Sequence, residues 1–201
     1  GGVVAVGALL YALHYFSADL PDFSQLASYE PPVVTRVHAG DGQLLEEFAR
    51  QKRVFVPVKA MPPLLIRAFV ASEDQNFFEH IGIDFRGIAR ATVSNLQAIG
   101  TGRRPEGAST ITQQVAKNFL LTNEVSLERK AKEAILAIRI ERAFSKDQIL
   151  ELYLNEIYLG RRSYGVAAAA LNYFDKSLDE LTLSEMAYLA ALPKAPNNYH
   201  P

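Results

Sequence analysis

The sequence of 201 residues contains no cysteine and only four histidines. Without cysteine, a thiolate nucleophile, a disulfide framework and a cysteine-ligated zinc or iron–sulfur centre are all excluded. The histidines, at positions 14, 38, 80 and 200, are scattered, and no two have the i, i+4 spacing that a helical zinc motif requires. The composition therefore argues against thiol chemistry and against a histidine-based metal site.

An excess of charge of either sign is also missing, since the chain has 21 Lys and Arg residues and 22 Asp and Glu residues. A chain whose positive and negative charges nearly cancel creates no strong positive electrostatic field that would bind a polyanion such as DNA. We therefore expect no nucleic-acid partner. Apolar residues make up 49% of the sequence. This content is sufficient for one buried core, so we do not expect intrinsic disorder.

Residues 1–16 contain no charged side chain and are mostly apolar. Tyr11, Tyr15 and Phe16 cluster at one end of this run, as aromatic residues do at a membrane interface. Because a complete span needs roughly 20 apolar residues, we predict a transmembrane helix over residues 1–17 whose start has been cut away. A buried core helix and the core of a signal peptide are the alternatives.

The segment after this run changes from a strand pattern to a helix pattern. Residues 33–38 and 43–48 are typical of two short strands around an Asp41-Gly42 turn. Residues 53–58 alternate as a third strand would, although the proline at position 57 limits it to a sheet edge. The sequence therefore predicts three parts, a transmembrane helix (1–17), a juxtamembrane linker with a β-hairpin (18–60) and a helical domain (61–201).

Capping residues indicate where the helices of this last part begin. They are Pro62-Pro63 before a helix over 64–72, Asp84 before 85–98, Ser109 or Thr110 before the next helix, and the capping boxes Ser145–Gln148 and Thr182–Glu185. Downstream of Met61 we expect only helices and loops.

An acidic pair, Glu73-Asp74, follows a run of apolar and small residues and precedes Phe77 and Phe78. Apolar surroundings raise the pKa of a carboxyl group, and a raised pKa beside a second acid suits acid–base chemistry on sugars. Taken alone, however, the pair also fits two ordinary charges at a helix end, because adjacent acids are common.

Residues 107–114, Gly-Ala-Ser-Thr-Ile-Thr-Gln-Gln, place hydroxyl groups ahead of two glutamines, and Lys117 follows three residues later. A helix N-terminus rich in hydroxyls can receive a phosphate, and Gln113 and Gln114 can hydrogen-bond to sugar hydroxyls. The alternative is that Thr110 only caps a helix and that the glutamines face water.

Glu133 heads an apolar stripe of Leu136, Ala137 and Ile140 on the predicted helix over 129–143. Arg129 and Lys130 precede it by four and three residues, so both lie on the same face. Opposed cations and a carboxylate can hold a diphosphate or a metal ion. A surface ion-pair cluster that contributes little to stability is the alternative.

Five motifs in a fixed order resemble glycosyltransferase family 51, the transglycosylase domain of class A penicillin-binding proteins and of monofunctional peptidoglycan glycosyltransferases. They are Glu73-Asp74 with Phe77, His80, Gly82 and Asp84, then Gly107–Gln114, Arg129–Glu133, Lys146–Asn155 and Ala191–Pro201. The resemblance covers roughly residues 61–201. It implies a mainly α, lysozyme-like two-lobed helical domain, here with an N-terminal transmembrane helix and a small β-rich linker.

The resemblance also implies the reaction, polymerisation of lipid II into β-1,4-linked glycan strands. Glu73 would be the base on the 4-hydroxyl of the acceptor GlcNAc, which attacks the anomeric carbon of the donor MurNAc with inversion and releases undecaprenyl diphosphate. Glu133 would act on the diphosphate side, directly or through a divalent cation, Mg²⁺ or Mn²⁺, with no organic cofactor. Substrate contacts or supports for Glu73 would be Asp74, Phe77, His80, Arg90, Thr110, Gln113, Gln114, Lys117, Arg129 and Lys130.

The resemblance places such a protein in the bacterial cytoplasmic (inner) membrane as a single-pass protein, with its catalytic domain on the periplasmic face. Its partners would be lipid II, the growing glycan strand, the lipid bilayer and other cell-wall synthesis proteins. The Ser-x-x-Lys and Lys-Thr-Gly motifs of a transpeptidase are absent, so we expect no penicillin binding. The predicted hairpin favours a piece trimmed from a bifunctional protein over the monofunctional type.

Two other functions remain open. A lytic transglycosylase or lysozyme-like hydrolase would share a helical fold and a catalytic glutamate, but it has no diphosphate leaving group for the cationic cluster to neutralise. A catalytically inactive membrane scaffold for cell-wall enzymes would need neither the acidic pair nor that cluster.

Overall fold

The computed structural model describes residues 16–17, 20–27, 35–38, 44–48, 52–102, 107–121 and 126–197. The predicted transmembrane helix at 1–17 therefore lies almost wholly outside the described residues. Within the described residues, no helix combines the length and the apolar composition that crossing a membrane requires.

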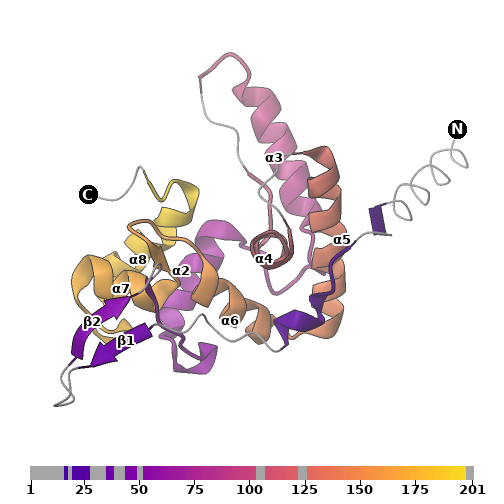
Figure 1. Cartoon of the computed structure of the whole chain (residues 1–201). Coiled ribbons are helices and arrows are strands. Elements are labelled where there is room, and N and C mark those ends of the chain that lie inside the picture. The colour runs from indigo at the N-terminus through magenta and orange to yellow at the C-terminus, as the bar shows by residue number, and fades with distance from the viewer. Residues whose placement is uncertain are drawn as a thin grey trace, which may run out of the picture. The chain divides into compact units, whose positions relative to one another are not determined.

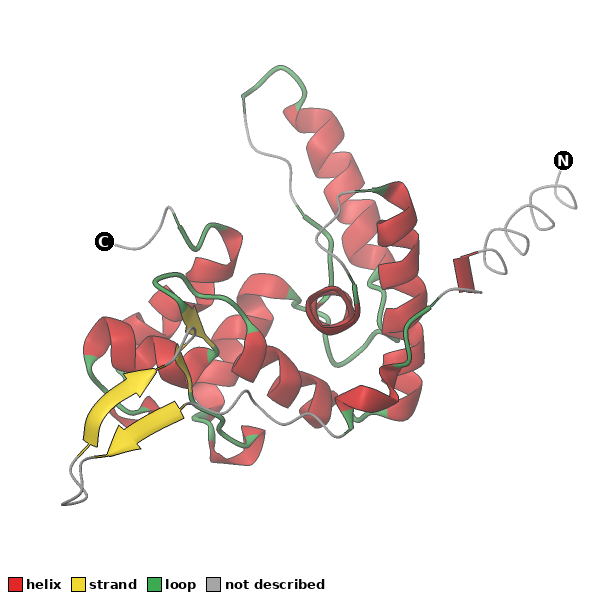
Figure 2. Cartoon of the chain, viewed as in Figure 1, coloured by secondary structure: helices red, strands yellow, loops and turns green. Residues whose placement is uncertain are grey.

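The described part of the chain is mainly helical, which confirms the predicted class (Figures 1 and 2). Its α-helices are α2 (Pro63–Glu73), α3 (Phe85–Ala98), α4 (Ile111–Leu120), α5 (Leu127–Ala143), α6 (Lys146–Glu156), α7 (Val166–Phe174) and α8 (Leu183–Ala191). The short elements are the 3-10 helices η1 (Phe23–Leu26), η2 (Val58–Ala60), η3 (Leu178–Glu180) and η4 (Leu192–Lys194), and the strands β1 (Thr35–His38), β2 (Leu44–Phe48), β3 (Lys52–Arg53) and β4 (Ser163–Tyr164). The likeness to lysozyme stays a prediction.

The chain divides into two compact units. The first unit takes residues 1–27 and 73–149, and the second unit takes residues 28–72 and 150–201. Both α2 and α6 belong partly to each unit, since α2 contributes only its last residue, Glu73, to the first unit, and α6 contributes Lys146 to Ile149.

The core of the first unit lies where α4 and α5 pack together. Both helices bury an apolar stripe with helical spacing, made of Ile111, Val115 and Ala116 on α4 and of Leu136, Ala137 and Ile140 on α5, all fully buried. Each large side chain in such a core stabilises the fold by about 1.5–3 kcal/mol through burial. The stripe that was predicted to follow Glu133 is confirmed.

The second unit has its own core, in which Phe69 of α2 meets Tyr153 of α6 edge to face at a ring separation of 6.4 Å. The predicted hairpin is confirmed, because β1 and β2 pair in antiparallel register with an irregularity between Val37 and His38. One strand was missed, since β4 lies in a region where only helices and loops were expected, and it pairs in parallel with β3.

The predicted strand over 53–58 is wrong beyond Arg53, because side chains of α6 take the place of a second strand. Asn155 accepts a hydrogen bond from the Val56 N–H at 2.9 Å and donates one to the Val56 carbonyl at 2.9 Å. Glu151 accepts from the Val58 N–H at 2.8 Å. Side chains of α6 therefore satisfy three backbone polar groups of this segment, which a neighbouring strand would otherwise pair.

A charged capping box at the start of α8 predicts how stability depends on pH. Lys176 donates to Glu185 at 2.7 Å, and Glu185 accepts from the Thr182 N–H at 2.7 Å. The Lys176 bond, and then the Thr182 bond, lower the pKa of Glu185 from 4.5 to about 2. Because the folded-state pKa is the lower one, Glu185 stabilises the fold above about pH 4.5, and this contribution disappears as the pH falls towards 2.

Replacing Glu185 with Gln should therefore weaken the loss of stability between about pH 5 and pH 2, measured as the free energy of unfolding by urea at each pH. Glutamine still accepts from the Thr182 N–H, so the comparison reports on charge and leaves the cap in place. Identical acid dependence in both proteins would contradict the prediction.

Candidate functional site

Glu73 is the last residue of α2. The helix therefore ends one residue later than predicted, since the sequence placed Glu73 just after it. Its Oε2 accepts a hydrogen bond from Nε2 of Gln114 at 2.9 Å, across 41 residues of sequence. The side chain is half-buried. The structure thus joins the acidic pair to the first turns of α4.

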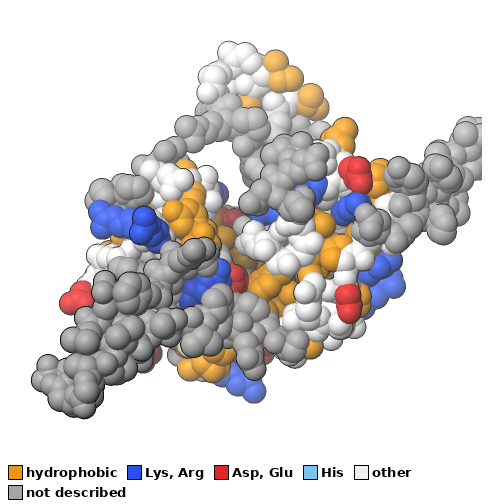
Figure 3. All heavy atoms as spheres, viewed as in Figure 1, with side chains coloured by type: hydrophobic (Ala, Val, Ile, Leu, Met, Phe, Trp, Pro, Cys, Tyr) orange, Lys and Arg blue, Asp and Glu red, His pale blue; other side chains and the backbone are white. Residues whose placement is uncertain are grey.

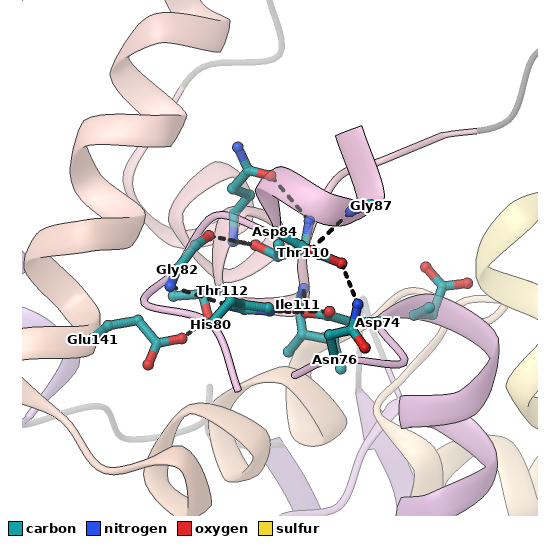
Figure 4. A network of polar contacts seen from close by, with 12 residues as sticks. Asp74, Asn76, His80, Gly82, Asp84, Gly87, Thr110, Ile111, Thr112 and Glu141 are labelled. Atoms are coloured by element: carbon teal, nitrogen blue, oxygen red, sulfur yellow. Dashed lines mark hydrogen bonds and ion pairs between the residues drawn. The ribbon is translucent and has the colours of Figure 1, made fainter. Parts of the chain in front are cut away.

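Asp74 is buried and is held by two donors (Figure 4). Nε2 of His80 lies 2.9 Å from its Oδ2, and the backbone N–H of Ile111, the first residue of α4, donates to the same oxygen at 2.9 Å. Nδ1 of His80 accepts from the Gly82 N–H at 3.1 Å, so the proton of the neutral imidazole must be on Nε2. Both donors of Asp74 are therefore fixed in direction, which suits a supporting role beside Glu73.

Gly82 ties the turn after the acidic pair to both α4 and α5. Its carbonyl accepts from the Thr110 hydroxyl at 2.7 Å (Figure 4). Its φ is +98°, and a Cβ atom there would lie 2.7 Å from the carbonyl oxygen of Ala137. Only glycine fits this conformation and this close approach, which explains its place in the first motif.

The end of that turn is the N-cap of α3, Asp84, as predicted. Burial raises the pKa of Asp84, but hydrogen bonds from the Gly87 N–H and from the Asn76 amide, both at 2.9 Å, outweigh it, and the net direction is downward. The Asp84 carboxylate therefore links Asn76, near the start of the segment that follows Glu73, to the first turn of α3.

Thr110 and Gln113 form a reciprocal capping box at the start of α4. The Thr110 hydroxyl accepts from the Gln113 N–H at 3.1 Å, and Oε1 of Gln113 accepts from the Thr110 N–H at 3.0 Å. Both side chains are buried. The structure therefore shows these two as caps, whereas Gln114 is the glutamine that reaches the acidic pair.

Glu133 lies between the two cations that the helical spacing predicted. Its carboxylate accepts from the Arg129 guanidinium at 2.5 Å and from Nζ of Lys130 at 2.8 Å, and only 2% of the residue is exposed. Nε of Arg129 is buried and has no hydrogen-bond acceptor among the described residues. The carboxylate of this cluster is therefore buried, whereas Lys130 is exposed. Two cations against one carboxylate leave an excess of one positive charge.

One short segment connects the two acidic residues. Lys130 also donates to the Ser109 hydroxyl at 2.7 Å, while Gln114, five residues later, donates to Glu73. Ser109 lies two residues before α4 and Gln114 is the fourth residue of this helix, so the two attachment points are separated by little more than one helical turn. Glu73 and the Glu133 cluster are thus bound to the same end of α4.

The remaining predicted residues differ in exposure. Phe77 is fully buried and packs edge to face on His80 at a ring separation of 6.1 Å, so it supports the turn. Lys117 on α4 and Arg90 on α3 are exposed. The sequence did not point to Glu141 and Lys146 as members of this network, although Lys146 begins the fourth motif.

The donor groups do not fit a metal ion held by protein alone. Within the described ranges, no three His, Asp or Glu side chains gather in a metal-binding group. Both oxygens of Glu133 already accept from a cation, Arg129 or Lys130, so a divalent ion would have to displace one of them.

Comparisons with known proteins agree on one family. The family model described as transglycosylase matches residues 41–201. Penicillin-binding protein 1A of Rickettsia felis is 58% identical over 199 residues, covering 99% of this chain and 25% of that protein. Penicillin-binding protein 1A of Escherichia coli is 45% identical, with 99% of this chain and 23% of that protein covered. The chain thus spans about a quarter of the length of these curated relatives.

A solved structure was also matched, the crystal structure of penicillin-binding protein 1A from Haemophilus influenzae. It is 32% identical in sequence, and the match covers 84% of this chain and 15% of that chain with a TM-score of 0.40.

Proposed function

Because the chain belongs to the transglycosylase family of peptidoglycan glycosyltransferases, we propose that it polymerises lipid II into β-1,4-linked glycan strands and releases undecaprenyl diphosphate. The observation that carries the proposal is the attachment of two unlike sites to one end of α4. Glu73 is bound there through Gln114, and the cationic Glu133 cluster is bound there through Ser109. One site suits proton removal and the other suits a diphosphate.

Glu73 acts as the general base. It takes the proton of the acceptor 4-hydroxyl while that oxygen forms a bond to the donor anomeric carbon, and the bond from this carbon to the diphosphate breaks with inversion. A general base must be within hydrogen-bond reach of the proton and correctly aimed. Gln114 directs one oxygen of Glu73, and the buried Asp74 beside it fixes the backbone from which Glu73 projects.

Arg129 and Lys130 neutralise the diphosphate as it leaves. Negative charge grows on the leaving group during the reaction, so cations there stabilise the transition state more than the ground state. Glu133 orients the two cations, because both are bonded to its carboxylate. The exposed Lys117 and Arg90 supply further positive charge towards the same substrate.

The substrate's polyprenyl tail requires a bilayer, and we place the protein in the inner membrane with this domain on the periplasmic face. Support comes from apolar side chains exposed on α3 and the turn before it, and Figure 3 shows hydrophobic side chains at the surface along α3. They are Phe78, Ile81, Phe85, Ile88, Val93, Leu96 and Ile99, which directly follows α3. Such a surface suits contact with lipid.

A direct test separates this function from a lysozyme-like hydrolase. The chain is incubated with labelled lipid II and, separately, with finished glycan strands, and the products are separated by length. We expect lipid II to be converted into longer strands while finished glycan stays unchanged. Shortening of the glycan with lipid II intact would establish the hydrolase, and no change in either would favour the inactive scaffold.

A further inference from the structure

Lys146, the first residue of α6, makes three contacts that the proposed reaction does not use. Its Nζ donates to Glu141 at 2.7 Å and to the carbonyl of His80 at 2.8 Å, and it lies 4.4 Å from the centre of the Phe77 ring. An ammonium group over an aromatic face is attracted to it. One side chain thus holds both ends of the turn from Phe77 to His80.

Glu141, the partner of Lys146, is itself bound to α4. It accepts from the Thr112 hydroxyl at 2.6 Å, and its side chain is only 7% exposed (Figure 4). Thr112 is fully buried in the first turn of α4. The ion pair therefore connects α4, α5 and the start of α6.

These contacts close a ring that contains Asp74, the residue next to Glu73. From Thr112 the ring runs through Glu141 and Lys146 to the His80 carbonyl, and from the His80 imidazole to Asp74. It then returns to α4 at the N–H of Ile111, the residue before Thr112. Figure 4 shows most of this ring beside the Thr110 cap.

We propose that Lys146 is a positioning residue for Glu73, an inference that rests on the function proposed above. By fixing His80 and Phe77, it holds the imidazole against Asp74 and so sets the direction in which Glu73 meets Gln114. A buried ion pair is a poor device for stability alone, because apolar residues of the same volume often stabilise as well. What it does supply is fixed geometry, and a small misplacement of a catalytic group can lower the rate greatly.

The test replaces Lys146 with Met, an unbranched side chain one atom shorter, which keeps most of the apolar stem and removes the charge. We expect turnover per folded molecule to fall at least about tenfold, with KM for lipid II changed less than about twofold, because only the transition-state geometry is disturbed. Lys176→Met is the matched control, since it breaks an ion pair with the same N–O distance of 2.7 Å in the second unit. Turnover of the control should stay near that of the wild type.

Lys146→Met leaves Glu141 without its cation, so a second variant separates folding from positioning. In Glu141→Gln with Lys146→Met, both charges are removed, and thermal stability should recover while turnover stays low. Recovery of turnover together with stability would overturn the proposal, as would wild-type turnover in Lys146→Met. A wild-type chain that does not polymerise lipid II would instead refute the proposed function, and this inference with it.

Discussion

Replacing Glu73 with Gln is expected to lower polymerisation of lipid II by about 10²- to 10⁴-fold, the usual contribution of a positioned general base. Glutamine has the same shape, and its carbonyl oxygen can still accept the hydrogen bond from Gln114. It cannot take a proton from the acceptor hydroxyl. Folding and binding of lipid II should therefore remain, and only the chemical step should fail.

The measurement compares initial rates of strand formation with lipid II binding and thermal unfolding for the same preparation. Glu79→Gln is the matched control, because Glu79 is an acid in the same turn whose side chain is 68% exposed. It should behave as the wild type. If Glu73→Gln keeps its rate, the base has been misassigned, however well the chain binds its substrate.

Replacing Arg129 with Met should lower turnover by about 10²- to 10³-fold, the typical cost of removing one donor from a developing anion. Glu133 would keep Lys130 as its partner, so the buried carboxylate is not left alone. The loss should appear in the chemical step because the negative charge of the diphosphate grows as the bond breaks. A hydrolase, which has no such leaving group, would lose little.

Two further variants make this result specific. Lys132→Met removes a cation three residues away on the same helix, one that pairs with the exposed Glu128 and not with Glu133, and its turnover should change little. In Arg129→Met the buried Glu133 carboxylate keeps only the partly exposed Lys130 as a cation. Arg129→Met combined with Glu133→Gln removes this buried charge and should therefore unfold at a higher temperature than Arg129→Met alone. If turnover recovers along with this stability, the guanidinium has a structural role only.

Several parts of the fold could be predicted because the interactions that decide them are local. Asp84, Thr110 and Thr182 cap their helices as predicted, since a cap binds a backbone group only three residues ahead. The Glu133 cluster was predictable for the same reason, because four residues of helix bring Arg129 beside it. The hairpin of β1 and β2 joins strands that are close in the sequence, and their antiparallel pairing agrees with the alternating pattern of residues 33–38 and 43–48.

The strand over 53–58 failed because its backbone partners are not local. Asn155 binds Val56 across 99 residues, and Glu151 binds Val58 across 93. An alternating pattern indicates which side of a segment is apolar, but it does not indicate which groups will hydrogen-bond to the backbone N–H and carbonyl groups. In this segment the partners are side chains of a helix.

The sequence by itself determined the residue types of the site and the pairing of Glu133 with its two cations, because that pairing needs only one turn of helix. The position of the Glu73 side chain, in contrast, depends on contacts that only the tertiary structure forms. Gln114 reaches Glu73 across 41 residues, and Lys146 reaches the His80 carbonyl across 66. Contacts over such separations exist only after the first unit has folded, because the buried stripes of α4 and α5, not the polar residues, bring its segments together.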